Sequence, residues 1–266
     1  MNSIVLGTFN NNKIKDLSEV VETCMLKGFS SFDTAPSYHT ETLLGEALQT
    51  CSKKLNIKRG NLHIIDKIDA WQMQDGHISK HFHNALQKLK LTYIDTLLIH
   101  WPIPEYMDTT WEQMEKLKED GIVKNIGICN VRVRHMKKFM NYNIPPQVIQ
   151  IERHPLNTNK EIVDFCKEKA IKVMAYSPLC RMDQRVKENK VLKRIALKYN
   201  KNVSQVILRW HIDTGVTPIF MSQSPQRITN NLDIFDFSLT SSEITAIESI
   251  NCNYKIYLES WGCPGF

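Results

Sequence analysis

Short apolar runs rich in β-branched residues alternate along this chain with longer segments in which apolar residues recur every three to four positions. The first pattern predicts buried strands and the second predicts helices that place one face on a core. Their alternation favours a parallel sheet covered by helices. Eight strands are predicted, at residues 4–9, 31–35, 62–68, 96–101, 126–130, 148–152, 172–177 and 218–222.

Capping residues predict the ends of some helices. Asp16 is expected to cap a helix that ends at Gly28. Thr109 and Glu112 are expected to form a capping box for a helix that ends at Gly121. Helical patterns beyond the simple strand–helix alternation are expected to pack outside the sheet. They lie at residues 191–199, 203–212, 225–234 and 242–250.

The length of 266 residues suits a single domain, residues 1–266, in which eight strand–helix units close into a (β/α)8 TIM barrel. Closure removes both edges of the sheet, and the interior of every predicted strand is apolar. An open doubly wound sheet is the competing fold. Its dinucleotide-binding version carries GxGxxG after the first strand, whereas this chain reads Gly-Thr-Phe-Asn-Asn-Asn from residue 7. The usual Rossmann fingerprint is therefore missing.

Composition excludes several classes of protein. Hydrophobic residues make up 42% of the chain and charged residues 23%, which is typical of a compact protein and excludes a disordered or collagen-like chain. The 34 basic and 28 acidic residues are interspersed, so the net charge of +6 favours solubility over a nucleic-acid-binding face. Seven irregularly spaced cysteines without a CxxC pair argue against a disulfide framework, and no apolar run approaches the ~18 residues of a membrane span. We expect a cytoplasmic protein that binds neither nucleic acid nor membrane.

Polar side chains with catalytic potential follow three consecutive predicted strands. The second strand carries Asp33, with Tyr38 just beyond it, the third carries Lys67, and the fourth ends near His100. In a barrel, the carboxyl ends of the strands meet at one rim, and this rim holds the active site. Later strands end in further polar groups. These are Asn130, Gln150 and Tyr176.

An Asp, a Tyr, a Lys and a His at one rim suit proton transfer. Taken singly, Asp33 could be a turn acceptor, Lys67 a snorkelling side chain and Tyr38 a surface packing residue. A phenol, with an ordinary pKa of about 10, needs help to act near neutrality. An ammonium ~4 Å away, at an effective dielectric of ~20, would favour phenolate by roughly 4 kcal/mol, or about 3 pKa units before desolvation. We therefore expect Lys67 to acidify Tyr38, and Asp33 to keep Lys67 charged and oriented.

Recognisable motifs are spread over nearly the whole chain. One reads Phe-Asp-Thr-Ala-Pro-Ser-Tyr-His-Thr-Glu from residue 32 and continues with Leu-Gly-Glu-Ala-Leu from residue 44. The others are Lys67, Tyr-Ile-Asp-Thr-Leu-Leu-Ile-His-Trp-Pro from residue 93, Gly121, Ile-Gly-Ile-Cys-Asn from residue 126, Gln150, and Ala-Tyr-Ser-Pro-Leu from residue 175. In this order the motifs resemble the aldo-keto reductase family, and the resemblance extends from about residue 5 to residue 250.

This resemblance implies a (β/α)8 barrel, a monomer or weak dimer, that binds an extended nicotinamide cofactor and reduces a small aldehyde or ketone. It implies a catalytic tetrad in which Tyr38 protonates the developing alkoxide. Lys67, held by Asp33, lowers the pKa of the phenol. His100 binds and orients the carbonyl oxygen.

The resemblance also implies contacts to the cofactor. Tyr176 would stack on the nicotinamide ring, while Asn130 and Gln150 would hold its carboxamide, which needs both donors and acceptors. The other implied cofactor contacts are Gly7, Thr8, Asp33, Cys129, Ser177, Leu179, Met221, Ser222, Arg227 and Asn231.

Three features depart from the family pattern. Met221 replaces a lysine that binds the 2′-phosphate of NADPH, and the lost contact is worth about 1.5–3 kcal/mol, so NADPH is the expected cofactor but NADH competes. Cys129 replaces a serine and is a poorer hydrogen-bonding group. The loop after Leu179 is short, and Arg181 is expected to contact phosphate in its place. These changes leave open a cofactor-binding protein with weak or no reductase activity that acts as a binding or regulatory subunit.

The substrate side of the pocket is predicted from Asp69, Trp101 and Trp261. Asp69 lies two residues after Lys67 and should share its side of the strand, where it would select a polar or cationic substrate or simply face water. Trp101 is an expected pocket wall. The tail at residues 252–266, which contains Trp261, is a candidate cover for the active-site mouth.

A metal site is a weaker interpretation of the chain. His77 and His81 are four residues apart on a predicted helix, a spacing that can bind metal, but no carboxylate at a fixed spacing completes the site. We expect this segment to be the exposed face of a helix that ends at Leu89, and we expect no metal. A metal-dependent barrel hydrolase is the third alternative function.

Overall fold

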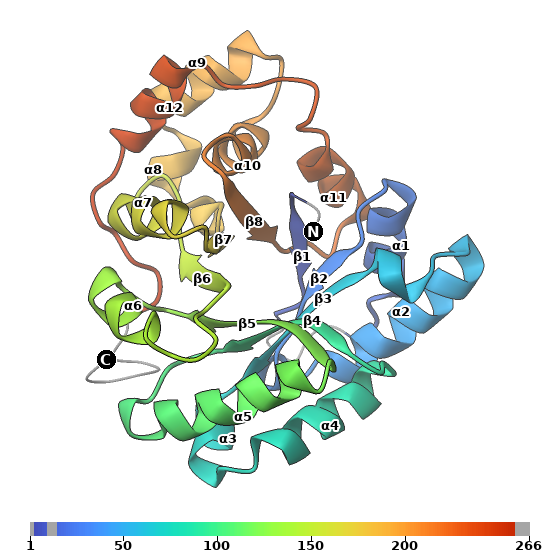
Figure 1. Cartoon of the computed structure of the whole chain (residues 1–266). Coiled ribbons are helices and arrows are strands. Elements are labelled where there is room, and N and C mark those ends of the chain that lie inside the picture. The colour runs from blue at the N-terminus through green and yellow to red at the C-terminus, as the bar shows by residue number, and fades with distance from the viewer. Residues whose placement is uncertain (1–2, 10–14, 259–266) are drawn as a thin grey trace.

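Eight parallel strands close into one barrel in the computed structural model, which describes residues 3–9 and 15–258 (Figure 1). The strands pair in chain order, and the last pairs with the first. They are β1 (Val5–Gly7), β2 (Ser31–Asp33), β3 (His63–Ile68), β4 (Ile94–Ile99), β5 (Val123–Cys129), β6 (Val148–Glu152), β7 (Lys172–Tyr176) and β8 (Val216–Phe220). The predicted (β/α)8 barrel is confirmed, and each predicted strand overlaps an observed one.

Helices surround the barrel on its outer side (Figure 1). The first six are α1 (Ser18–Leu26), α2 (Glu41–Leu55), α3 (Ala70–Asp75), α4 (Ile78–Leu89), α5 (Met107–Glu119) and α6 (Val133–Phe139). The others are α7 (Lys160–Glu168), α8 (Gln184–Lys187), α9 (Lys190–Lys198), α10 (Val203–Asp213), α11 (Pro225–Leu232) and α12 (Ser241–Glu248). Of the helices in residues 3–9 and 15–258, none combines the length and the apolar character needed to cross a membrane.

The four additional helices are observed where the sequence predicts them, as α9 to α12. Apolar residues of α8, α9, α10 and α12 form a cluster of their own, separate from the main core between the strands and the surrounding helices. Figure 1 shows α9 and α12 side by side, away from the barrel axis. The expectation that these helices pack outside the sheet is confirmed for this group.

Helix capping agrees with the prediction at one site and differs at another. The carboxylate of Asp16 accepts a hydrogen bond from the backbone of Ser18 at the start of α1, at 2.8 Å. The capping box predicted for α5 is wrong, because the helix begins at Met107, before Thr109. A 3-10 turn, η3 (Pro104–Tyr106), leads directly into this helix and sets its start. The hydroxyl of Thr109 therefore binds a backbone carbonyl within the first turn.

Side chains of each strand alternate between the barrel interior and the helix layer. The apolar cluster that fills the interior consists of Val5, Ile65, Leu98, Cys129, Val148, Met174 and Ile219. Lys67, His100, Gln150 and Tyr176 each follow a member of this cluster by two residues. They therefore lie on the same face of the sheet, nearer the carboxyl ends of the strands. The barrel thus supplies an apolar floor with polar groups above it.

The opposite face of β3 carries an unusual buried carboxyl group. Asp66 is fully buried, and neither of its oxygens has a hydrogen-bond partner among the described residues. Glu41, at the start of α2, is also buried and has one unpartnered oxygen. Burial, and then the nearby Glu41 carboxylate, raise the pKa of Asp66 well above its ordinary value. Asp66 therefore binds a proton in the folded protein that the unfolded chain releases.

This carboxyl group makes stability depend on pH. A raised folded-state pKa stabilises the fold at low pH, and that stability is lost as the pH rises through the folded-state pKa. We expect Asp66→Asn to raise the free energy of unfolding by about 1–3 kcal/mol more at pH 9 than at pH 5, as measured by urea denaturation. The wild type loses this stability above the ordinary carboxyl pKa of 3.8, whereas the amide does not titrate. Asp164→Asn, at an exposed ion pair with Lys160, is the control and should show no such rise with pH. An equal effect of Asp66→Asn at both pH values would contradict the prediction.

Candidate active site

Four side chains that the sequence predicts to act together converge at the carboxyl ends of β2, β3 and β4. The Lys67 ammonium donates hydrogen bonds to Asp33 Oδ1, at 2.7 Å, and to the carbonyl oxygen of Thr34, at 2.8 Å. The same nitrogen lies 4.6 Å from the centroid of the Tyr38 ring. This ring packs edge to face against His100, with centroids 5.5 Å apart. The tetrad therefore forms one continuous cluster.

Tyr38 is positioned by a short turn. Residues Pro36–Tyr38 form a 3-10 turn, η1, three residues after β2. Proline at its first position presets the backbone φ angle, and His39 ends the turn in the left-handed region, with φ of 55°. Phe9 packs edge to face against the Tyr38 ring at 5.1 Å. These contacts hold the ring beside Lys67.

The pKa of Tyr38 is raised above its ordinary value of 10, so the predicted acidification is wrong in direction. Burial is the largest cause, because a phenolate removed from water is destabilised. Lys67 lowers the pKa of Tyr38, as predicted, but by less than burial raises it, and Asp33 cancels part of the effect. The ammonium therefore lies beside the phenol as predicted, but desolvation of the phenol outweighs its effect.

The pKa of Lys67 is also raised. Burial alone would lower it, but the nearby Asp33 and Tyr38 groups raise it by more. The side chains of Lys67 and Asp33 are almost completely buried. This agrees with the expectation that Asp33 keeps Lys67 charged.

Amide side chains link the tetrad to neighbouring strands. Gln150 Nε2 donates a hydrogen bond to Asp33 Oδ2 at 2.8 Å. Asn130 Nδ2 donates to the carbonyl oxygen of His100 at 2.8 Å, and Asn130 Oδ1 accepts from the Tyr176 hydroxyl at 2.7 Å. Asn130 has a φ of 60°, a left-handed conformation that asparagine tolerates well. An amide nitrogen has two hydrogens, so each of these amides keeps one for a ligand.

Asp69 is buried against the cluster. Its side chain is engaged by His100 Nδ1, 2.5 Å from Oδ1, and by the backbone nitrogen and hydroxyl of Ser37, at 2.7 and 3.1 Å. Its exposed fraction is only 5%, so the interpretation as a loop carboxylate facing water is wrong. Asp69 does line the cleft, and its contact with substrate stays a prediction.

A cleft of about 1090 Å³ lies at this end of the barrel. Tyr176 supplies an aromatic ring near the tetrad, and Ser222, Arg227 and Asn231 supply a hydroxyl, a cation and an amide on the wall formed by β8 and α11. These groups fit the flat ring and the charged phosphates of an extended nicotinamide dinucleotide. Of the expected cofactor contacts, those that line the cleft are Gly7, Asp33, Asn130, Gln150, Tyr176, Ser177, Leu179, Met221, Ser222, Arg227 and Asn231.

Thr8 and Cys129, two further expected cofactor contacts, do not line this cleft. The Thr8 hydroxyl is buried and donates to the backbone oxygen of Asp33 at 2.9 Å. Cys129 belongs to the apolar cluster inside the barrel. Burial raises the pKa of its thiol, the reverse of what a reactive cysteine needs. Cys129 is therefore part of the apolar floor of the site, and Thr8 fixes the backbone at Asp33.

The departures from the family pattern lie on the cleft wall after β7 and β8. Met221 is 51% exposed on the cleft wall, where the family resemblance implies a lysine. Arg181 also lines the cleft, and its guanidinium donates to the Tyr257 hydroxyl at 2.7 Å. Cys180, Arg181 and Met182 all have positive φ angles, which marks a tightly turned loop after β7. The phosphate contact proposed for Arg181 stays a prediction.

Aromatic residues line the part of the cleft predicted to hold the substrate. Trp101 lines it, as predicted, and Trp261 lies outside the described residues. Two further aromatic residues of the lining were not predicted as site residues: Trp71, which is 53% exposed on the cleft wall, and Phe9 beside Tyr38. Trp71 lies four residues after Lys67 in the loop and helix that follow β3. The rule that barrel sites are built from the segments after each strand could have identified it.

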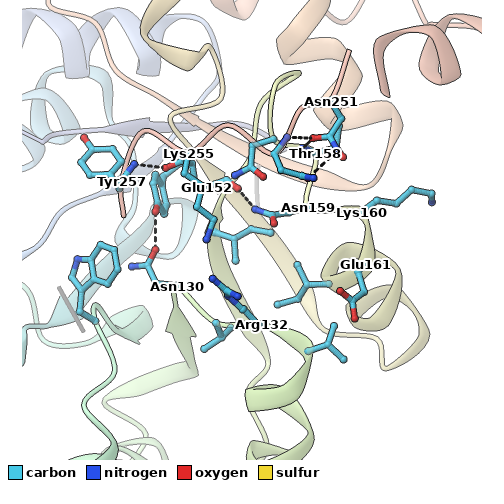
Figure 2. Close-up of a pocket in the computed structure, with 18 residues that line it drawn as sticks. Asn130, Arg132, Glu152, Thr158, Asn159, Lys160, Glu161, Asn251, Lys255 and Tyr257 are labelled. Carbon is cyan, nitrogen blue, oxygen red and sulfur yellow. Dashed lines mark hydrogen bonds between the residues drawn. The ribbon is translucent and has the colours of Figure 1, made fainter. Parts of the chain in front are cut away.

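A smaller pocket of about 430 Å³ adjoins the cleft (Figure 2) and shares Trp101, Asn130, Tyr176 and Tyr257 with it. Glu152, at the end of β6, accepts hydrogen bonds from the backbone nitrogens of Ile256 and Tyr257, at 2.8 and 2.9 Å. The chain after α12 is therefore fastened to the barrel, and its described part reaches the cleft wall. The rest of the tail that was predicted to cover the mouth, residues 259–266, lies outside the described residues.

The histidines considered for metal binding have other contacts. His81 Nε2 pairs with Asp75 at 2.6 Å, and His77 is the residue before α4. Leu89, the last residue of α4, is buried as expected. In the part of the chain that the structure describes, no group of three or more His, Cys, Asp or Glu side chains is arranged to bind a metal ion.

Comparisons with known proteins agree with the fold. The aldo/keto reductase family model matches residues 3–252. Glyoxal reductase of Bacillus subtilis is 36% identical over 94% of this chain and 89% of its own length. An aldo-keto reductase from a Medee basin deep-sea metagenome library superposes with a TM-score of 0.91 at 34% identity, covering 97% of this chain and 94% of that one. A Bombyx mori aldo-keto reductase, solved in complex with NADP, gives a TM-score of 0.90 at 31% identity, with 98% and 93% covered.

The family match at residues 3–252 covers all eight barrel strands and the four-residue cluster at their rim. The resemblance to the aldo-keto reductases stated from the motifs is confirmed. The chain belongs to the aldo/keto reductase family of NAD(P)H-dependent oxidoreductases.

Proposed function

We propose that this chain reduces small aldehydes and α-dicarbonyl compounds with NADPH, and that Tyr38 donates the proton to the substrate oxygen. The observation that carries the proposal is the buried Lys67–Asp33 ion pair against the Tyr38 ring, at the base of a cleft that fits a dinucleotide. The glyoxal reductase activity named for the Bacillus relative supports small dicarbonyl substrates.

Different site residues would bind the cofactor and transfer the proton. Bound reduced nicotinamide would supply the hydride. Tyr176, whose hydroxyl is fixed by Asn130, offers the ring against which the nicotinamide lies. The spare hydrogens of Asn130 and Gln150 would bind its carboxamide.

Tyr38 is suited to donate rather than to accept a proton. Because the pKa of its hydroxyl is raised, the phenol keeps its proton near neutral pH. An alkoxide is a stronger base than a phenolate, so the developing alkoxide still takes this proton. Lys67 then stabilises the phenolate that remains, since its ammonium lies beside the ring. His100, whose ring packs against that of Tyr38, would bind the same substrate oxygen.

The test is the oxidation of NADPH, followed by its absorbance, across a panel of glyoxal, simple aldehydes and ketones. We expect turnover with the small aldehydes and dicarbonyls. Tight binding of the cofactor without turnover on any carbonyl would instead favour the binding or regulatory subunit. That alternative is based on Met221 and Cys129, which depart from the family pattern.

The exposed Met221 predicts a modest preference between cofactors. We expect Met221→Lys to lower the dissociation constant for NADPH about ten- to hundredfold and to leave that for NADH unchanged, because a lysine adds a charge-assisted bond to the 2′-phosphate. Fluorescence titration with both cofactors measures the effect. Leu197→Lys adds the same charge at an exposed position on α9, outside the cleft lining, and should change neither constant. Unchanged NADPH affinity in Met221→Lys would show that position 221, just after β8, does not contact that phosphate.

A further inference from the structure

The His100 ring is held from behind by a fixed carboxylate. Asp69 Oδ1 lies 2.5 Å from His100 Nδ1. The other oxygen of Asp69 accepts from the backbone nitrogen of Ser37 at 2.7 Å, and the Asp69 backbone nitrogen donates to the side chain of Gln72 at 2.8 Å. Asp69 is also the residue that caps α3. These contacts from three segments leave the carboxylate little freedom to turn away from the imidazole.

The charge of Asp69 fixes which ring nitrogen carries a hydrogen. Burial alone would raise the pKa of Asp69, but hydrogen bonds from His100 and Ser37 lower it overall, so the group is ionised near neutral pH. A carboxylate can only accept, and His100 Nδ1 must therefore carry the hydrogen between them. A neutral imidazole has one such hydrogen, so its Nε2 is then a bare acceptor. Nε2 of His100 has no partner among the described residues, and His100 lines the cleft.

A bare Nε2 conflicts with the role proposed for His100, which is to bind the carbonyl oxygen of the substrate. A carbonyl oxygen is an acceptor and gains nothing from a second acceptor. Only the imidazolium, with a hydrogen on both nitrogens, can donate to a carbonyl oxygen while it remains bonded to Asp69. The neutral ring can instead accept the hydroxyl hydrogen of an alcohol.

We propose that Asp69 is a positioning residue that fixes the tautomer of His100, so that carbonyl reduction requires the imidazolium form while the neutral form favours the alcohol. The inference rests on the proposed reductase function. It assigns to the Asp69–His100 pair a pH-controlled choice between the two directions of the reaction.

The groups that face His100 determine its pKa, and therefore the pH at which the favoured direction changes. Burial lowers the pKa of His100, and the Lys67 ammonium on β3 lowers it further. Asp69 and, at the end of β2, Asp33 raise it. Tyr38 on η1 packs against the ring as a neutral phenol, and Asn130 on β5 contacts only the His100 backbone. The net result is a pKa below the ordinary 6.5.

The wild-type protein should therefore reduce carbonyls best in mildly acidic solution. We expect kcat/KM for carbonyl reduction to fall with rising pH from pH 6.5 to 8.5 and to fall about tenfold per pH unit above pH 7.5, because the imidazolium fraction falls by that factor well above its pKa. Over the same range kcat/KM for oxidation of the matching alcohol should not fall.

Asp69→Asn tests the tautomer directly. The backbone nitrogen of Ser37 can only donate, so the oxygen of the new amide should take the position facing Ser37. The amide NH2 group then faces His100 Nδ1, which must accept, and the hydrogen of the neutral ring moves to Nε2. The neutral ring can now donate to a carbonyl. We expect the pH profile of reduction to become flat, and Asp69→Asn to exceed the wild type at pH 8.5 by tenfold or more.

The capping role of Asp69 does not confuse this test, because asparagine is an equally good residue before a helix. Asp75→Asn is the matched control. Asp75 pairs with His81 at 2.6 Å in the same chemical manner, outside the cleft lining, and should leave the profile unchanged.

Nitrogen-15 NMR of labelled histidine gives a readout that does not depend on turnover. Above pH 8, the bare nitrogen of His100 should be Nε2 in the wild type and in Asp75→Asn, and Nδ1 in Asp69→Asn. A wild-type ring with its hydrogen on Nε2, or parallel pH profiles in Asp69→Asn and wild type, would overturn the inference. If no variant reduces any carbonyl, the proposed function fails, and the NMR result alone decides the tautomer.

Discussion

Replacement of Tyr38 by phenylalanine is expected to lower kcat for carbonyl reduction by about 10²–10⁴-fold, the usual contribution of a positioned proton donor. The phenylalanine ring keeps the edge-to-face contacts with Phe9 and His100, at 5.1 and 5.5 Å. The melting temperature and the dissociation constant for NADPH should therefore change little. Steady-state oxidation of NADPH with the best substrate of the panel measures the loss.

The matched control for this variant is Tyr142→Phe. The Tyr142 hydroxyl bonds Asp108, and its ring stacks on Trp111 and Phe139, all outside the cleft lining. Tyr142→Phe also removes a phenol hydroxyl and should leave kcat unchanged. Turnover of Tyr38→Phe within a fewfold of the wild type would remove Tyr38 from its role as proton donor.

The fold was predictable because its signals are local and repeated. The strand interiors are apolar, and each strand is followed by a helical pattern, so the order of elements is evident without any knowledge of contacts. Boundaries were less accurate where two start signals compete. Thr109 has the right spacing to Glu112 for a capping box, but Pro104 starts a 3-10 turn that begins α5 earlier. A pattern of two residues cannot show which signal is used.

The candidate site was predictable to the extent that strand ends meet at one rim. The grouping of Asp33, Tyr38, Lys67 and His100 follows from strand order and from the two-residue alternation. The direction of the Tyr38 pKa does not, because it depends on how deeply the ring is buried. Pairings across the rim, such as Asp69 with His100, depend on side-chain direction in loops. Spacing along the sequence carries little information about that direction.

Replacement of Lys67 by methionine is expected to damage both stability and catalysis. The Lys67 ammonium and the Asp33 carboxylate are buried and 2.7 Å apart. Methionine would keep much of the volume but leave Asp33 as a buried carboxylate without its cation, which costs about 3–5 kcal/mol of folding free energy. Turnover should also fall, because the phenolate of Tyr38 would lose the positive charge 4.6 Å from its ring. Urea denaturation and NADPH oxidation measure the two effects separately.

The double variant Asp33→Asn/Lys67→Met separates these two consequences. Removing the carboxylate charge removes the cost of burying it alone, and the new amide can still pair with the Gln150 side chain, which bonds Asp33 at 2.8 Å. Most of the lost stability should therefore return, while turnover stays low, because no cation faces Tyr38. If the double variant is as unstable as Lys67→Met, the lost stability comes from packing of the lysine stem and not from the unpaired charge. If turnover returns together with stability, Lys67 acts only in folding, and the phenol needs no neighbouring ammonium to release its proton.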